Sequence, residues 1–351
     1  MYSLQAKHED ILGWQILDNK IYHKVKNDNY RLYERNIKTF EILWRSDLKL
    51  ICDFATCKEW IVFDSDDNDR TIVVNRESKE LYWTLNNRFA FGVNLLNDKF
   101  LLGNSRRKSF IIDILSKEVK EYEKEDYSFV LIRGDDVICR NKLKTILSCR
   151  SICSDLLKVW HFDITQFGPY RDSKIFANEE PELRQREINR VYYHNNKIIV
   201  TLSRAIIALN PDNGELLWKI DFENYDPVNL LFDGNIAYSG RLIYFAIIDI
   251  EKGIKLFEKD FDPAYRFEVE GFKLSQIRYI GLTLHENHLW FTHEDKGHQF
   301  LLKANPKNGD IIKGMLLETK LSTYPPLFDE NRMYLLDQEG VLWIYEIDGN
   351  D

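Results

Sequence analysis

The sequence predicts an all-β chain: an eight-bladed β-propeller whose blades are four-stranded antiparallel sheets, with seven blades as the alternative. Three observations predict this fold. A unit of strand, tight turn and strand recurs along the chain. Its turn signals are spaced by about 40 residues, which is a repeat length of propeller blades. The last unit lacks an outer strand, and the N-terminal residues are suited to supply it.

The clearest copy of the unit covers residues 205–222. Residues 206–209 are apolar, Asn-Pro-Asp-Asn-Gly fills 210–214, and Leu-Leu-Trp-Lys-Ile at 216–220 resumes an extended run. A cluster of Asn, Pro, Asp and Gly between two apolar runs signals a turn. The stretch therefore predicts the two outer strands of one blade.

Turn signals mark eight units. They begin at Asp18, Lys58, Asn97, Gly134, Asn195, Asp233, Glu286 and Asp329. A short apolar run follows each turn, as at 60–63 and 198–200, and is suited to a buried strand. The fourth run of most units carries a large side chain at a similar place: Trp44, Trp83, Tyr122, Trp160, Trp218 and Phe257. Packing between blades requires one such residue per blade, so we interpret the series as core.

The two ends of the chain indicate that the repeat closes. The eighth unit stops after a strand predicted at 341–347, where a fourth strand is still missing. Residues 2–7 alternate apolar and polar side chains, as a strand with one buried face does. We expect this segment to complete the last blade, to remove its exposed edge and to make residues 1–351 a single domain.

Two connections are much longer than the others. Residues 166–189 separate the fourth and fifth units, and residues 262–279 separate the sixth and seventh. Both connect consecutive blades, so we expect both on the face that also carries the loops between second and third strands. Loops on a rigid scaffold often carry function, and we interpret this face as a partner-binding surface. Its candidate residues in the two insertions are Tyr170, Arg171, Tyr265 and Phe267.

Cations gather in two loops that the repeat places on adjacent blades. They are Arg106, Arg107, Lys108, Arg140, Lys142 and Lys144. Such a concentration repels itself and favours an anionic partner. The alternative is two ordinary solvated turns.

Composition limits the class of protein. The formal net charge of −8 over 351 residues disfavours nucleic acid as the partner, because phosphate binding depends on surplus Lys and Arg. No run has the length and hydropathy of a signal peptide or a membrane span, so we expect a cytoplasmic protein. Five cysteines are an odd number for a disulfide framework. Alternation places Cys149 and Cys153 on one face of a strand, and we interpret them as packed thiols.

Two motifs invite a metal site, and the spacing argues against both. His285 and His288 flank one end of a predicted strand, whereas His293 and His298 flank the other end, roughly 16 Å away at about 3.3 Å per residue. Each pair alone offers too few ligands for zinc. The loop 64–69 has oxygen ligands at alternating positions, but it lacks the Gly and the bidentate Glu of a calcium loop. We expect no metal.

The unit at 205–222 resembles the pyrroloquinoline-quinone-like repeat family, through Ala-Leu-Asn-Pro-Asp-Asn-Gly at 208–214 and Leu217-Trp218. Residues 247–253 and 303–309 match more loosely. The resemblance implies a β-propeller, often eight-bladed, in a family of quinone-dependent dehydrogenases and non-catalytic scaffolds. This chain departs from the enzymes, because only the fifth unit keeps a Gly and Trp pair and no vicinal Cys-Cys pair is present. We therefore expect a member that binds no quinone and no other cofactor.

The function predicted from these observations is a non-catalytic, cytoplasmic protein-interaction scaffold. Its partner would dock on the loop-rich face, and a bacterial complex subunit or a toxin-neutralising immunity protein would fit this description. No catalytic residue can be named. The alternative is an enzyme, a hydrolase, lyase or degenerate quinoprotein, with an active site in the central funnel. Convergent polar side chains in a deep axial pocket would distinguish the enzyme from the scaffold.

Overall fold

The computed structural model describes residues 2–9, 11–65, 70–86, 95–104, 108–123, 127–172, 182–223, 225–241, 244–260, 266–274, 280–320 and 325–347. Regular structure in these residues is antiparallel β-sheet, apart from short 3-10 turns such as η2 (Ile164–Phe167), so the all-β prediction is confirmed. The chain divides into two compact units. The N-terminal unit is His8–His161, and the C-terminal unit is Met1–Lys7 with Phe162–Asp351.

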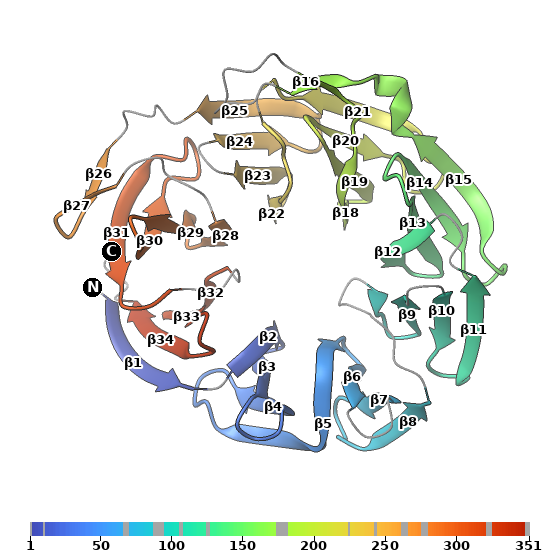
Figure 1. Cartoon of the computed structure of the whole chain (residues 1–351), viewed down its shortest axis with the longest axis horizontal. Helices are drawn as coiled ribbons and strands as arrows, with labels where there is room; N and C mark the ends of the chain where they lie inside the picture. Colours follow the sequence, from blue (N-terminus) through green and yellow to red (C-terminus); the bar gives the residue numbers. More distant parts are fainter. Residues whose placement is uncertain are drawn as a thin grey trace. The chain divides into compact units, whose positions relative to one another are not determined.

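Three sheets form the N-terminal unit, drawn from blue to green in Figure 1. The first has seven strands: β2 (Ile11–Leu17), β3 (Lys20–Val25), β4 (Arg31–Asn36), β5 (Ile42–Thr56), β6 (Trp60–Ser65), β7 (Arg70–Asn75) and β8 (Leu81–Leu85). The second has three: β9 (Phe100–Asn104), β10 (Lys108–Asp113) and β11 (Glu118–Glu123). The third has four: β12 (Tyr127–Arg133), β13 (Asp136–Asn141), β14 (Ile146–Ser151) and β15 (Leu157–Asp163).

The seven-stranded sheet contains the first two repeats, which the sequence predicts as separate blades. Strand β5 is 15 residues long and serves both. Its first half pairs with β4, as in Arg31 with Lys49, and its second half pairs with β6, as in Leu50 with Ser65. The last strand of the first repeat is therefore continuous with the first strand of the second.

The C-terminal unit contains four sheets of four strands and two short hairpins. The first sheet has β18 (Ile188–His194), β19 (Lys197–Leu202), β20 (Ala205–Leu209) and β21 (Leu216–Asp221). The second has β22 (Leu231–Asp233), β23 (Ile236–Arg241), β24 (Tyr244–Asp249) and β25 (Ile254–Asp260). The third has β28 (Ile280–His285), β29 (His288–Asp295), β30 (His298–Ala304) and β31 (Ile311–Leu317). The hairpins are β16 (Tyr170–Asp172) with β17 (Glu182–Arg184), and β26 (Phe267–Val269) with β27 (Phe272–Leu274).

The fourth sheet of this unit joins the two ends of the chain. It has β32 (Leu327–Asp329), β33 (Arg332–Leu336), β34 (Leu342–Ile347) and, outermost beside β34, β1 (Tyr2–His8). Residues 2–7 therefore occupy the position that the sequence predicts for them. The ammonium of Lys7 lies 3.6 Å from the centroid of the Trp343 ring, and its Nζ lies 3.5 Å from a carboxylate oxygen of Glu318. The N-terminal strand thus covers an edge that β34 would otherwise expose.

Two-residue turns set the register of the hairpins. Asp18–Asn19, Asn195–Asn196 and Glu286–Asn287 each have two consecutive residues with positive φ, as a type I′ turn requires. Asn and Asp adopt this conformation at low cost. The turn signals predicted at these three positions are therefore confirmed.

Sheets of the same unit pack through their outer aromatic residues. Trp218 on β21 donates from its indole N–H to the carbonyl of Ile250 in the next sheet, at 3.1 Å. Its ring lies on Gly253, where an added Cβ would come within 2.6 Å of the Trp218 Cβ. In the N-terminal unit, the hydroxyl of Tyr122 on β11 donates to a carboxylate oxygen of Asp155, which follows β14 of the next sheet, at 2.8 Å. The contacts of Trp218 and Tyr122 support the interpretation of the aromatic series as packing between blades.

Candidate partner-binding surfaces

The turn between β13 and β14 is the candidate surface of the N-terminal unit, and we call residues 140–144 the basic turn. Asn141, the last residue of β13, holds the turn through hydrogen bonds. Its side-chain oxygen accepts hydrogen bonds from the amides of Thr145, at 2.7 Å, and Ile146, at 2.9 Å. Its own carbonyl accepts from the Lys144 amide at 3.0 Å, and Lys144 has a φ of 58°. These bonds order the turn within the chain itself, without a contact from a partner.

The basic turn carries an exposed apolar residue at its tip. Leu143 is 73% exposed, the largest value among the exposed large apolar side chains of the described residues. Lys142 and Lys144 on either side of it are also exposed. Burial of a leucine side chain is favourable, and exposure to this degree leaves that free energy available to a partner.

The structure distributes the six predicted cations unequally. Lys108, at the start of β10, forms an ion pair with Glu121 on β11, so its charge is compensated within the sheet. Arg140 is half-buried. Arg106 and Arg107 lie outside the described residues. The exposed cations of the basic turn are therefore Lys142 and Lys144, and sequence reasoning missed Leu143 between them.

The first insertion is held to the C-terminal unit by two buried arginines. The guanidinium carbons of Arg186 and Arg204 both lie 5.8 Å from the centroid of the Tyr170 ring. Arg186 is 8% exposed and donates to the carbonyl of Ser203 at 2.8 Å, and it pairs with Asp221 at 3.2 Å. Tyr170, a predicted partner residue, thus lies at the anchor of the hairpin.

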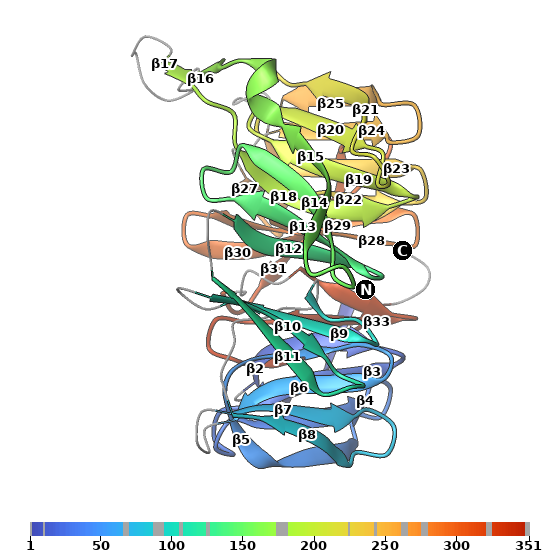
Figure 2. The same cartoon turned by 90° about the vertical axis from the view of Figure 1, so that its right-hand side faces the viewer.

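The hairpin itself faces outward through its other side, and Figure 2 shows β16 and β17 standing away from β18–β21. Arg171 and Leu183 are cross-strand partners and share one face of the ribbon. Arg171 is exposed and Leu183 is 70% exposed. A cation beside an exposed leucine therefore occurs here as it does at the basic turn.

The second insertion forms the hairpin β26–β27, which packs on the sheet β28–β31. Figure 1 shows β26 and β27 outside β31, the outermost strand. Val269 and Leu274 are buried, and an added Cβ on Gly314 would lie 2.7 Å from Val269 Cγ2, so glycine permits this close approach. Phe267, a predicted partner residue, is half-buried against the same core, and Tyr265 lies outside the described residues. The hairpin lies along β31, whereas the sequence analysis expected it on the loop face.

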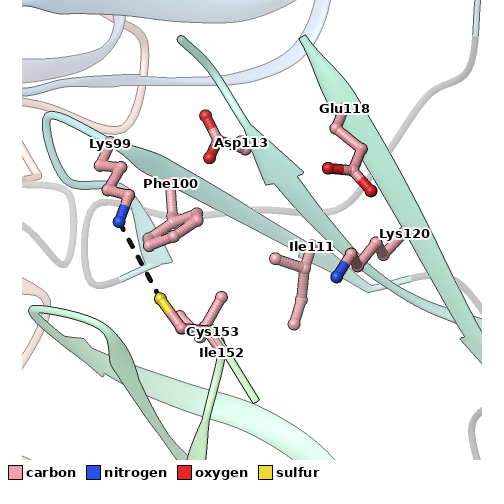
Figure 3. Close-up of a pocket in the computed structure, with 8 residues that line it drawn as sticks. All are labelled: Lys99, Phe100, Ile111, Asp113, Glu118, Lys120, Ile152 and Cys153. Carbon is pink, nitrogen blue, oxygen red and sulfur yellow. Dashed lines mark hydrogen bonds between the residues drawn. The ribbon is translucent and has the colours of Figure 1, made fainter. Parts of the chain in front are cut away.

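A small hollow lies beside the three-stranded sheet of the N-terminal unit, with a volume of about 100 Å³ (Figure 3). Lys99 Nζ lies 2.9 Å from a carboxylate oxygen of Asp135 and 4.0 Å from Cys153 Sγ. The hydrogen bond to Asp135 raises the pKa of Lys99, so its ammonium stays charged at neutral pH. Asp113 and Glu118 also line the hollow. The charged residues of this hollow are therefore held by an ion pair between Lys99 and Asp135.

The cysteines of the fourth repeat separate in the structure. The prediction that Cys149 and Cys153 share one strand is wrong, because β14 ends at Ser151 and Cys153 lies exposed in the following turn. Cys149 is fully buried, as predicted. Burial raises the pKa of the neighbouring Cys139 thiol to about 12, which makes it unreactive.

No protein-family model matches the chain, and no curated protein matches its sequence. Solved structures do match over the whole length. BamB from Moraxella catarrhalis is 11% identical with a TM-score of 0.63, over 99% of this chain and 100% of BamB. The computationally designed Ika8 protein is 14% identical with a TM-score of 0.63, over 98% of both chains. KlHsv2 with loop 6CD replaced by a Gly-Ser linker is 8% identical with a TM-score of 0.55, over 88% of this chain and 99% of that one.

The chain has a β-propeller fold. BamB is a propeller of pyrroloquinoline-quinone-like repeats, and its structural similarity supports the β-propeller fold that the resemblance at residues 205–222 implies. In this propeller the Trp218 ring meets the glycine of the following repeat, Gly253. Gly253, which precedes Phe257 by four residues in its own repeat, therefore belongs to the turn that receives the aromatic residue of the repeat before it.

The residues of the two motifs that invite a metal site make contacts within the protein. His285 stacks on Phe328 with centroids 4.4 Å apart, and burial lowers its pKa. His293 is buried within β29. The Asp64 carboxylate accepts from the Thr71 hydroxyl at 2.7 Å across β6 and β7, and Asp66 and Asn68 lie outside the described residues. Within the described ranges, no three metal-ligating side chains come together, and no helix has the length and hydropathy to cross a bilayer.

Proposed function

We propose that the chain is a non-catalytic scaffold that binds a protein partner through the basic turn. Leu143 enters an apolar pocket of that partner, and Lys142 and Lys144 meet carboxylates around the pocket. The observation that carries this proposal is the 73% exposure of a leucine on a turn that Asn141 holds in one conformation.

Charge supports the same partner chemistry. The whole chain has a formal net charge of −8, so an acidic partner is repelled by most of the surface and attracted at the basic turn. Burial of one leucine contributes about 1.5–3 kcal/mol, and each exposed ion pair adds about 0.2–1 kcal/mol. The preformed turn also lowers the entropic cost of binding.

The finer features of the scaffold are part of this proposal. The repeats form eight blades around one axis, with β1 closing the last blade, and the protein acts in the cytoplasm. A subunit of a bacterial complex, or an immunity protein that covers an acidic surface of a toxin, fits a propeller with a cationic docking turn. A disulfide between cysteines placed on β1 and β34 tests the closure, because the locked protein is expected to remain folded and to bind the same partner.

The test is a pull-down from host lysate, with partners identified by mass spectrometry. We expect Leu143→Ser to weaken binding by about tenfold or more, and Lys142→Glu with Lys144→Glu to weaken it further at low salt. Leu115→Ser is the matched control, since Leu115 is 58% exposed in another turn of the same unit. Recovery of unchanged partners by the triple variant would remove the basic turn from the proposal.

A further inference from the structure

An arginine of the N-terminal unit is half-buried without a carboxylate partner. Arg35 lies near the end of β4. Its Nε donates a hydrogen bond to Nε2 of His23 at 3.0 Å, and its Nη1 donates to the carbonyl of Phe40 at 2.9 Å. Burial lowers the pKa of His23 to about 3, so His23 is neutral at physiological pH. Both acceptors are therefore uncharged, and no carboxylate in the described part of the chain pairs with this guanidinium.

Three other arginines with little exposure each have a carboxylate partner. The pairs are Arg76 with Asp18, Arg186 with Asp221 and Arg204 with Asp226. Burial opposes the charge of Arg76, but its hydrogen bond to Asp18 raises its pKa. Burial lowers the pKa of Arg35. Because a charge removed from water is normally paired, Arg35 needs a counter-ion that the described residues do not supply.

The side chains around Arg35 leave one edge of its guanidinium open. The guanidinium carbon lies 4.9 Å from the centroid of the Phe40 ring and 5.4 Å from that of Tyr33. These rings attract a cation, but they carry no net charge that compensates it. Nη2 has no hydrogen-bond partner among the described residues, and it is not buried. This nitrogen is therefore available to a ligand.

The carboxylate of Asp28 does not take this place. It accepts a hydrogen bond from the Tyr33 hydroxyl. Its two oxygens lie 3.9 Å from a guanidinium nitrogen of Arg31 and 3.7 Å from one of Arg45. Asp28 is thus shared by two other arginines, and Arg35 remains uncompensated.

His8 adds a second, titratable charge to the site. Its ring stacks on the Phe40 ring with centroids 3.8 Å apart. Neither ring nitrogen of His8 has a partner within the described ranges, and neither is buried. Burial and the charge of Arg35 lower the pKa of His8. An anion bound at Arg35 has the opposite effect, because it stabilises the imidazolium form.

We propose that Arg35 binds a phosphate group, with His8 protonated in the bound state. The open edge of the guanidinium donates to the phosphate oxygens, as arginine commonly does. Arg35 and protonated His8 together carry two positive charges, which match a phosphate dianion better than a carboxylate with one charge. No residue of the basic turn takes part, so this proposal does not depend on the proposed function.

The experiment uses the full chain and inorganic phosphate, with phosphorus NMR line broadening as the measurement and sodium chloride holding the ionic strength constant. We expect saturable broadening that sulfate reverses by competition. N-acetyl-phosphoserine amide is the second probe. Binding of this monoester as tightly as the free ion supports a phosphate carried by a larger molecule, and its exclusion supports the free ion.

Substitutions test the two charges separately. Arg35→Gln is expected to weaken phosphate binding by about tenfold or more, since hydrogen bonds to charged groups are lost. Arg45→Gln is the matched control and retains binding, because Arg45 has its own carboxylate. His8→Gln is expected to weaken binding by about two- to fivefold, and it tests the site if Arg35→Gln does not fold.

The pH dependence gives a readout that a merely structural role of these residues would not move. Sulfate is the probe, because it stays a dianion between about pH 6 and pH 8. His8 takes up a proton when the anion binds, so sulfate binds more tightly as the pH falls through this range, by up to about tenfold per pH unit. His23 stays neutral and does not contribute. His8→Gln is expected to abolish this dependence.

Unchanged phosphate binding by folded Arg35→Gln overturns the proposal. So does wild-type protein that gives no saturable broadening, or chloride that displaces phosphate as well as sulfate does. A pH dependence that persists in His8→Gln overturns the protonation of His8 in the bound state.

Discussion

Replacing Gly253 with alanine tests the contact on which sheet packing in the C-terminal unit depends. Gly253 has a φ of 66°, and a Cβ at this position would overlap the Trp218 ring from the preceding sheet. The substitution therefore has two costs. The backbone must hold an alanine in the left-handed region, and Trp218 must leave the carbonyl of Ile250.

The two costs can be separated with Gly234→Ala. Gly234 has a φ of 55° and no atom within 4 Å of an added Cβ, so alanine there costs only the backbone strain, about 1–2 kcal/mol. Displacement of Trp218 at the other site loses a hydrogen bond worth about 1 kcal/mol and exposes part of a large ring, worth about 1–2 kcal/mol more. We expect Gly253→Ala to destabilise the protein by about 2–3 kcal/mol more than Gly234→Ala.

Urea unfolding followed by circular dichroism and tryptophan fluorescence measures the difference. A second measurement uses a Trp218→Ala background, in which the clash is absent and Gly253→Ala is expected to cost only the backbone strain. Equal costs for the two glycine substitutions in the wild type, or an undiminished cost in the Trp218→Ala background, would refute the reasoning.

Three further predictions concern stability. Burial, together with the nearby Arg35 guanidinium, lowers the pKa of His23 from 6.5 to about 3. The unfolded chain therefore takes up this proton at a higher pH than the folded protein does. The free energy of unfolding is unaffected by His23 above about pH 6.5 and falls as the pH drops below it, with a slope of up to about 1.4 kcal/mol per pH unit. His23→Gln is expected to flatten the dependence of the unfolding free energy on pH between 4 and 7 by about this slope, and an unchanged profile would be evidence against it. Glu34→Gln, at a fully buried carboxylate paired with two lysines, is expected to cost about 3 kcal/mol in urea unfolding, against less than about 0.5 kcal/mol for the exposed Glu318→Gln. Deletion of residues 2–7 exposes the edge of β34, and we expect a lower melting temperature and concentration-dependent light scattering; monomeric, equally stable protein would contradict this role of β1.

Local turn chemistry made much of the fold predictable. Asn195–Asn196 and Asp18–Asn19 predict type I′ turns because Asn and Asp residues tolerate a positive φ, and the turns in turn locate the strands on either side. The alternating residues of the N-terminal strand were readable for the same reason, since one buried face imposes a period of two. The continuity of β5 was not predictable. Charged residues interrupt its apolar pattern at Arg45, Asp47 and Lys49, and only pairing with both neighbours keeps it extended.

The candidate surfaces were only partly predictable. The lysines of the basic turn are visible as a charge cluster, but whether a charge is compensated depends on partners distant in sequence, as Glu121 is from Lys108. Leu143 and Leu183 were missed because a single leucine among polar residues has no periodic pattern that distinguishes an exposed side chain from a buried one. The signal that could have identified Leu143 is Asn141 followed by Thr145, the two ends of a closed polar turn, which leave the leucine no route inward.

Strand β5 has a consequence for how the molecule opens. One 15-residue strand supplies hydrogen bonds to both of the first two repeats, so neither can melt while the other keeps β5 fully ordered. Amide hydrogen exchange is expected to report these repeats as one cooperative block. A new chain terminus engineered within β5 would break both repeats at once, whereas one engineered in the turn between β7 and β8 would disturb a single hairpin.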